Sequence, residues 1–167
     1  MKEKILEALD SLGFKLEEEE NLGYSFNYEG LNLLFMYSED DTNFLNIALP
    51  GIYEANDGNV LQVCALMEKI NSTLKYVKAY LFGSSVWIFY ERELFGDEDL
   101  PLVISRMVLR LESGAQFARK TIAEIEEAMP NGSSDEESGG AVEETVEEET
   151  VEEETAVEKS DDDNNNE

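Results

Sequence analysis

The segment from Asp99 to Pro130 constrains the fold most, because it predicts one long helix with both ends marked in the sequence. Asp99 can cap the N-terminus, Pro101 fits the first turn, where its missing N–H costs nothing, and Pro130 stops the helix. Between these ends, apolar residues recur at steps of three and four, which is a helical period: Ile104, Val108, Leu111, Ala115, Ala118, Ile122, Ile125 and Met129. At about 1.5 Å per residue the helix would be roughly 40 Å long, so we expect its C-terminal end to extend past the sheet and to contact something else.

The sequence before this helix predicts two shorter helices and five strands. Apolar residues have helical spacing in 2–12 and 60–74, and strand-like patterns occur in 24–28, 31–38, 44–49, 76–82 and 86–94. Pro50-Gly51 is expected to end the third strand, and residues 14–20 could either begin a strand or form a solvated loop. The order α-β-β-β-α-β-β-α is typical of an α+β fold, here an antiparallel five-stranded sheet with helices on one face.

The last two predicted strands are apolar on both faces. Their alternation places Val77, Ala79 and Leu81 on one face, and Tyr76, Tyr80 and Phe82 on the other, while Trp87 and Phe89 oppose Val86, Ile88 and Tyr90. Three helices cannot cover both faces of a five-stranded sheet, so these aromatic side chains are either core residues or a surface that a partner or a second copy covers. The predicted partner-binding residues are Tyr76, Tyr80, Phe82, Trp87, Phe89, Phe117, Ile122, Ile125 and Met129.

The charge excludes several classes of ligand. The chain has 12 basic and 39 acidic residues, a formal charge of −27, so direct binding of nucleic acid or of an anionic membrane is not expected. The sequence contains neither an apolar run long enough to span a membrane nor the apolar region of a secretory signal. We therefore expect a cytoplasmic protein.

The last 37 residues differ in character from the rest. Residues 131–167 hold 16 of the 39 acidic residues and one of the 12 basic residues, and they repeat a Val-Glu-Glu-Thr or Val-Glu-Glu-Glu-Thr unit. So few apolar residues cannot offset the entropy lost on ordering. The sequence therefore predicts a folded domain in 1–130 and a disordered acidic tail in 131–167.

The chain lacks the residues that most catalytic sites need. It has no histidine, and its one cysteine, Cys64, is expected to lie in the buried stripe of the second helix as an inert thiol. Glu91 and Glu93 are two apart on a strand and fit a solvated strand end better than a carboxylate pair. The acidic runs lack the ligand spacing of a calcium loop. We therefore expect a protein that is not an enzyme and has no metal or cofactor.

Several short stretches together resemble a known family: residues 45–50 (Leu-Asn-Ile-Ala-Leu-Pro), residues 68–71 (Glu-Lys-Ile-Asn), residues 85–91 (Ser-Val-Trp-Ile-Phe-Tyr-Glu), and the last helix with Ala115 and Phe117. Over residues 3–129 the chain resembles the YbjN-like family, described as candidate regulators of bacterial sensory transduction, whose fold is similar to that of type III secretion chaperones. The resemblance implies a bacterial, cytoplasmic, commonly homodimeric protein that binds other proteins and carries no catalytic residues.

Residue pattern and resemblance lead to one main hypothesis. The domain is expected to be a chaperone-like adaptor or regulator that holds a segment of a partner protein through an apolar sheet face and the C-terminal helix. The alternative hypothesis is a regulatory protein whose acidic tail engages a basic partner or mimics nucleic acid.

Overall fold

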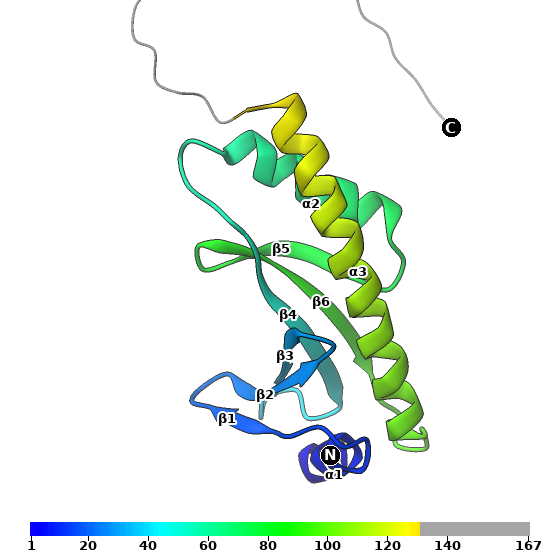
Figure 1. The fold of residues 1–167 in the computed structure, drawn as a ribbon. Coiled ribbons are helices and arrows are strands. Elements are labelled where there is room, and N and C mark those ends of the chain that lie inside the picture. The colour runs from blue at the N-terminus through cyan, green and yellow to red at the C-terminus, as the bar shows by residue number, and fades with distance from the viewer. Residues whose placement is uncertain (131–167) are drawn as a thin grey trace, which may run out of the picture. The chain divides into compact units, whose positions relative to one another are not determined.

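The computed structural model describes residues 1–130 and shows an α+β fold with three helices and six strands (Figure 1). The elements are α1 (Lys2–Ser11), β1 (Glu17–Glu19), β2 (Gly23–Tyr28), β3 (Leu31–Met36), β4 (Phe44–Glu54), α2 (Val60–Thr73), β5 (Lys78–Phe82), β6 (Ser85–Glu93) and α3 (Leu100–Ala128). The predictions for residues 131–167, a disordered tail that engages a basic partner, lie outside the described residues.

The sheet is antiparallel with the strand order β1-β2-β3-β4-β6-β5, so the prediction of five strands was wrong. The sixth strand is β1, in the segment that sequence patterns left open. Its three residues, Glu17–Glu19, are all exposed and pair with β2 at the edge of the sheet. A strand at an edge needs only backbone hydrogen bonds, and carboxylates in water repel one another weakly, so this strand forms without an apolar face.

Strand β4 continues past Pro50, where the sequence predicted its end. The register with β6 shifts between Leu49, which pairs with Ile88, and Tyr53, which pairs with Val86. Gly51 has a φ of 62°, a conformation that glycine adopts at little cost. Pro50 and Gly51 therefore form a β-bulge that the strand crosses, rather than its end.

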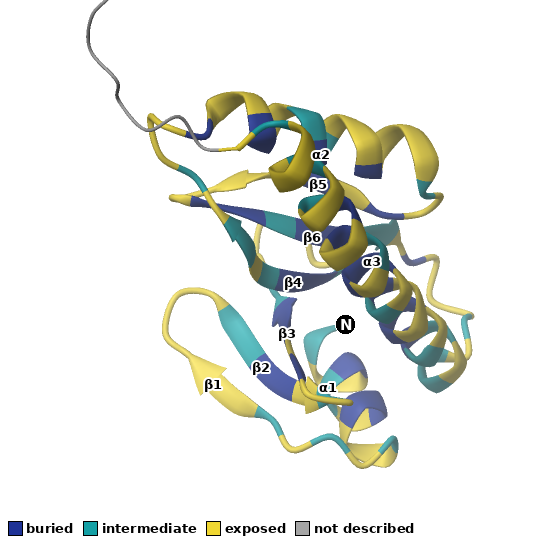
Figure 2. Ribbon diagram, turned by 45° about the horizontal axis from the view of Figure 1, so that its top comes forward, coloured by how far each residue is buried: buried dark blue, intermediate teal, exposed yellow. Residues whose placement is uncertain are grey.

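One hydrophobic core lies between the sheet and all three helices. Figure 2 shows buried residues along the inner sides of α1, α2 and α3 and exposed residues along their outer sides. The core includes Ile5 and Leu9 of α1, Leu66 and Ile70 of α2, Ile104 and Leu111 of α3, and Leu45, Ile47 and Ile88 of the sheet. The helices thus cover one face of the sheet, as the sequence predicted.

Helix α3 begins as predicted, with Asp99 as its N-cap and Pro101 in the first turn. The Oδ1 atom of Asp99 accepts a hydrogen bond of 3.1 Å from the backbone N–H of Leu102. The C-terminal half of α3 packs against α2 (Figure 1), and Gln62 Nε2 donates a 2.9 Å hydrogen bond to the carbonyl of Met129. The surplus length of α3 therefore contacts α2 of the same domain.

The contact with α3 also decides which side of α2 is buried. The buried residues of α2 are Gln62, Val63, Leu66 and Ile70. Cys64 is exposed, so its prediction as a core thiol was wrong. The helix is turned so that polar Gln62 reaches α3, and this rotation carries Cys64 out of the buried stripe.

Candidate functional site

Four aromatic residues lie together on the sheet face that the helices leave uncovered. Tyr80 pairs with Trp87 across β5 and β6, and Phe82 and Phe89 lie on the same face two residues along each strand. Ile88, between Trp87 and Phe89, points the other way and packs under Gly114 of α3. We call Tyr80, Phe82, Trp87 and Phe89 the aromatic patch.

The rings of the patch contact one another closely. Tyr80 and Phe89 stack with centroids 4.1 Å apart and planes 4° apart, while the centroids of Phe82 and Trp87 are 4.6 Å apart. Phe89 is fully buried beneath its neighbours, but Tyr80 is 38% exposed and Phe82 37% exposed. Such aromatic pairs contribute about 0.5–1.5 kcal/mol each beyond burial of their area. The patch is therefore an ordered surface and not a set of loose side chains.

An apolar row continues from the patch across the centre of the sheet. Phe89 pairs with Ala48 on β4, which pairs with Leu34 on β3. All three residues are buried, yet none belongs to the core cluster beneath the helices. The uncovered face thus has a small apolar layer of its own, which is continuous with the patch at Phe89.

Polar groups border the patch at the β4–β6 side. Lys78 and Glu91 form an ion pair, and Asn46 Nδ2 donates a 3.1 Å hydrogen bond to Glu91 Oε1. The Oδ1 atom of Asn46 is buried and has no hydrogen-bond partner among the described residues. Burial, followed by the charge of Glu91, raises the pKa of the Tyr80 hydroxyl. The border is therefore polar, and the unpartnered oxygen of Asn46 lies beneath the surface rather than on it.

Both edges of the sheet are protected against pairing with another strand. At one edge β1 presents three exposed glutamates. At the other edge, Asn71 Oδ1 accepts a 2.7 Å hydrogen bond from the N–H of Ala79, and Asn71 Nδ2 donates a 2.9 Å hydrogen bond to its carbonyl. Because α2 occupies the outer backbone groups of β5 at Ala79 and β1 is short and acidic, the face of the sheet is a more favourable binding surface than its edges.

Tyr76 lies away from the patch, although strand alternation predicted it there. It has a φ of 71°, in the left-handed region, and its ring turns to the helix side of the sheet. There it stacks on Tyr90 with centroids 6.0 Å apart, and the guanidinium of Arg110 lies 5.4 Å from its ring centre. The side chains of β5 alternate between the two faces of the sheet, but this alternation does not extend back to Tyr76, where the backbone is left-handed.

The predicted residues of α3 also lie on the helix side. Phe117, Ile122 and Ile125 are partly buried against the core, and Met129, half-buried, sits where α3 meets α2. The predicted partner-binding residues are therefore divided among three places: four in the patch, Tyr76 beside α3, and four along α3. Their role in binding a partner remains a prediction.

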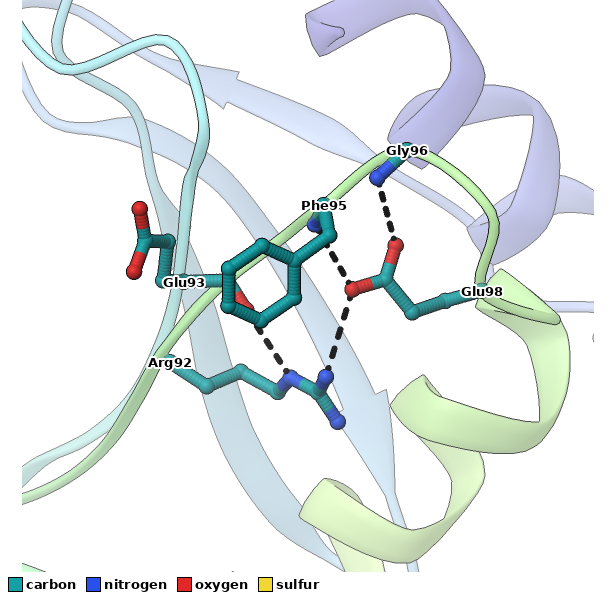
Figure 3. Close-up of polar contacts among 5 residues, drawn as sticks. All are labelled: Arg92, Glu93, Phe95, Gly96 and Glu98. Atoms are coloured by element: carbon teal, nitrogen blue, oxygen red, sulfur yellow. Dashed lines mark hydrogen bonds and ion pairs between the residues drawn. The ribbon is translucent and has the colours of Figure 1, made fainter.

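The turn between β6 and α3 presents an aromatic residue that the sequence patterns did not single out. Phe95 is 78% exposed, while the turn around it is held by Glu98 (Figure 3). Glu98 accepts hydrogen bonds of 2.8 Å from the N–H of Phe95 and 2.9 Å from that of Gly96, and Arg92 Nη2 lies 3.3 Å from Glu98 Oε1. The only feature of the sequence that indicated a turn here was Gly96, which precedes the acidic residues Asp97 to Asp99.

The described residues give no geometry for a metal site or a membrane span. Within 1–130, no three His, Cys, Asp or Glu side chains gather where they could hold a metal ion. Among the helices of this part of the chain, none is long and apolar enough to cross a membrane.

Comparison with known proteins identifies the fold. No protein-family model and no curated protein matches the sequence. The structure is similar to the crystal structure of YbjN, described as a candidate transcription regulator from E. coli, with a TM-score of 0.56 and 16% sequence identity. The match covers 73% of this chain and 91% of that one. The chain therefore has a YbjN-like fold, as the resemblance in its sequence predicted.

Proposed function

We propose that residues 1–130 form a non-enzymatic protein-binding domain, a chaperone-like adaptor or regulator that holds an apolar segment of a partner protein. The observation that carries this proposal is the aromatic patch, in which Tyr80 and Phe82 remain more than one third exposed on an uncovered sheet face. Aromatic side chains contribute most to binding where they form an ordered, central surface. A bacterial regulator with a YbjN-like fold, acting in the cytoplasm, is the specific form that we propose.

The geometry favours binding through side chains on the sheet face. The two edges are protected by glutamates and by Asn71, so a partner strand gains little by extending the sheet. The stacked rings offer apolar area, and the ion pair of Lys78 and Glu91 lies at its border. We therefore expect a partner segment with apolar or aromatic residues.

We also propose that two copies cover each other's aromatic patches when no partner is present. A two-fold axis brings the same surface of both copies together, so each chain would cover the aromatic rings of the other. A homodimer of this kind would compete with the partner segment for Tyr80 and Phe82 rather than assist it.

A peptide-display selection tests the proposal. The full chain is immobilised and challenged with a random peptide library, and each enriched peptide is measured against two variants, Phe82→Ser and Leu61→Ser. Leu61 is a matched control because it is a 73% exposed apolar residue on α2, away from the patch. We expect peptides with apolar residues whose affinity falls about tenfold or more in Phe82→Ser and is unchanged in Leu61→Ser. Equal affinity for both variants would contradict the proposal.

A further inference from the structure

A groove on the helix side of the sheet has a charge opposite to that of the domain around it. Two adjoining hollows of about 470 and 420 Å³ lie between α3, the chain before β5 and the end of β6. They share Tyr76, Arg110 and Ser113, and we call them together the arginine groove. Their volumes are in the range of small-molecule sites, about 300–1,000 Å³.

Cationic side chains are concentrated in this groove. Residues 1–130 carry 11 basic and 23 acidic residues. Four of the 11 basic residues line the groove, and no Asp or Glu is among its lining residues. These four are Lys75, Arg92, Arg106 and Arg110. An average surface region of this domain would carry more acidic than basic residues. The groove instead has a positive local potential.

Two of the arginines have no carboxylate partner among residues 1–130. Arg92 is paired with Glu98, but neither Arg106 nor Arg110 forms an ion pair within the described part of the chain. Arg106 and Arg110 are one turn apart on α3, so their charges repel each other unless an anion lies between them. The domain therefore holds an unfavourable charge pair that a bound anion would relieve.

Aromatic residues position Arg110 without neutralising it. Its guanidinium lies 5.4 Å from the ring centre of Tyr76, which in turn stacks on Tyr90. A cation over a ring keeps its full charge and its N–H donors. The left-handed backbone at Tyr76 places this ring on the helix side, so the turn before β5 supports the groove rather than the aromatic patch.

From this arrangement we infer that the arginine groove binds a small ligand that carries a phosphate group. Guanidinium groups match phosphate oxygens with paired N–H donors, and unpaired arginines lose no existing ion pair when they bind one. We expect a compact ligand. At physiological salt charges interact only within about 8 Å, so a small anion in the groove interacts mainly with the arginines that line it. A long polyanion such as nucleic acid would extend beyond the groove and be repelled by the acidic surface around it.

The test is isothermal titration calorimetry of the full chain with inorganic phosphate, pyrophosphate, ADP and citrate at physiological ionic strength. The variants are Arg106→Gln and Arg110→Gln, and Arg119→Gln is the matched control because it makes the same charge change at an exposed position of α3 outside the groove. We expect one pyrophosphate per chain, bound about tenfold or more weakly by each groove variant and unchanged by the control. All three replaced residues are exposed, and circular dichroism verifies that the variants fold.

The remaining probes identify the ligand more closely. ADP binding more tightly than pyrophosphate supports a phosphate with an attached organic group, and equal or weaker binding supports a free-phosphate site. Absence of pyrophosphate and ADP binding at millimolar concentration overturns the inference. So does an equal loss in Arg119→Gln, which would indicate only general electrostatics, or citrate binding as tightly as pyrophosphate, which would indicate charge without phosphate recognition. The groove and the aromatic patch lie on opposite faces of the sheet, so this result is independent of the proposed function.

Discussion

Glu98 holds the turn between β6 and α3 with one carboxylate. Its oxygens accept hydrogen bonds from the N–H groups of Phe95 and Gly96 and lie beside Arg92. The hydrogen bond from Phe95 is the largest cause that lowers the pKa of Glu98, followed among the lowering causes by the N–H of Gly96, while partial burial opposes them. The ionised form is therefore the one that stabilises the turn.

Replacement of this carboxylate has a pH-dependent effect. A glutamate whose pKa is lowered in the folded state stabilises the protein above its unfolded pKa, and this stabilisation is lost as the pH falls through the folded value. We expect Glu98→Gln to unfold at lower urea than the native chain at neutral pH, with the difference shrinking as the pH falls below about 4. Urea unfolding at several pH values measures this, and a constant difference would show that the charge of Glu98 is not involved.

Residue-level predictions from the sequence were right where the cause is local. Asp99 caps α3 because an N-cap needs only its own side chain and the next turn. Cys64 and Tyr76 were placed wrongly because their positions depend on distant contacts. Gln62 of α2 bonds to Met129, 67 residues away, and the ring of Tyr76 contacts Arg110 of α3.

At the scale of elements, α3 carries a glycine that its packing does not require. A Cβ atom at Gly114 would lie 3.6 Å from Ile88 Cδ1, an ordinary contact distance. Glycine inside a helix costs about 1 kcal/mol relative to alanine. We therefore expect Gly114→Ala to raise the free energy of unfolding by about 0.5–1 kcal/mol. Urea unfolding followed by circular dichroism tests this, and a loss of stability would mean that Ile88 cannot adjust.

The elements themselves could be predicted wherever apolar residues repeat. The three helices and the strands β2, β3, β5 and β6 have such repeats, and the structure contains each of them. Strand β1 consists only of glutamates and forms through pairing with β2. Such pairing leaves no apolar repeat in the sequence from which the strand could be predicted. The second half of β4 was missed because Pro50-Gly51 also marks strand ends, and only its pairing with β6 distinguishes a bulge.

At the scale of the whole molecule, charge opposes the proposed homodimer. Each chain has a formal charge of −27, so two copies repel each other, and added salt screens this repulsion. Light scattering of the full chain is therefore expected to show a dimer fraction that increases with salt. Phe82→Glu should remain monomeric at every salt concentration, because it adds a charge to the shared patch. A dimer that persists in this variant would place the interface elsewhere.

The binding surface was predictable only in part at this scale. Strand alternation grouped Tyr80, Phe82, Trp87 and Phe89 on one face, and the structure places them together. The helical stripe of α3 and its expected overhang added Phe117, Ile122 and Ile125 as partner-binding residues, whereas they pack against the core on the helix side. Periodicity identifies which residues of an element share a face, but not which other element that face contacts. The arginine groove has no sequence pattern because three separate segments supply its cations.

The emission of Trp87 tests the central claim most directly, because it is the only tryptophan of the chain and lies within the aromatic patch. The full chain is titrated at low salt, where charge repulsion favours the monomer, with a peptide obtained by display selection while Trp87 fluorescence is recorded. If the patch holds the partner segment, emission shifts to shorter wavelength with a saturable dependence on peptide concentration, and Phe82→Ser weakens the transition about tenfold or more. Saturable binding in calorimetry with unchanged Trp87 emission and unchanged affinity in Phe82→Ser would contradict the account.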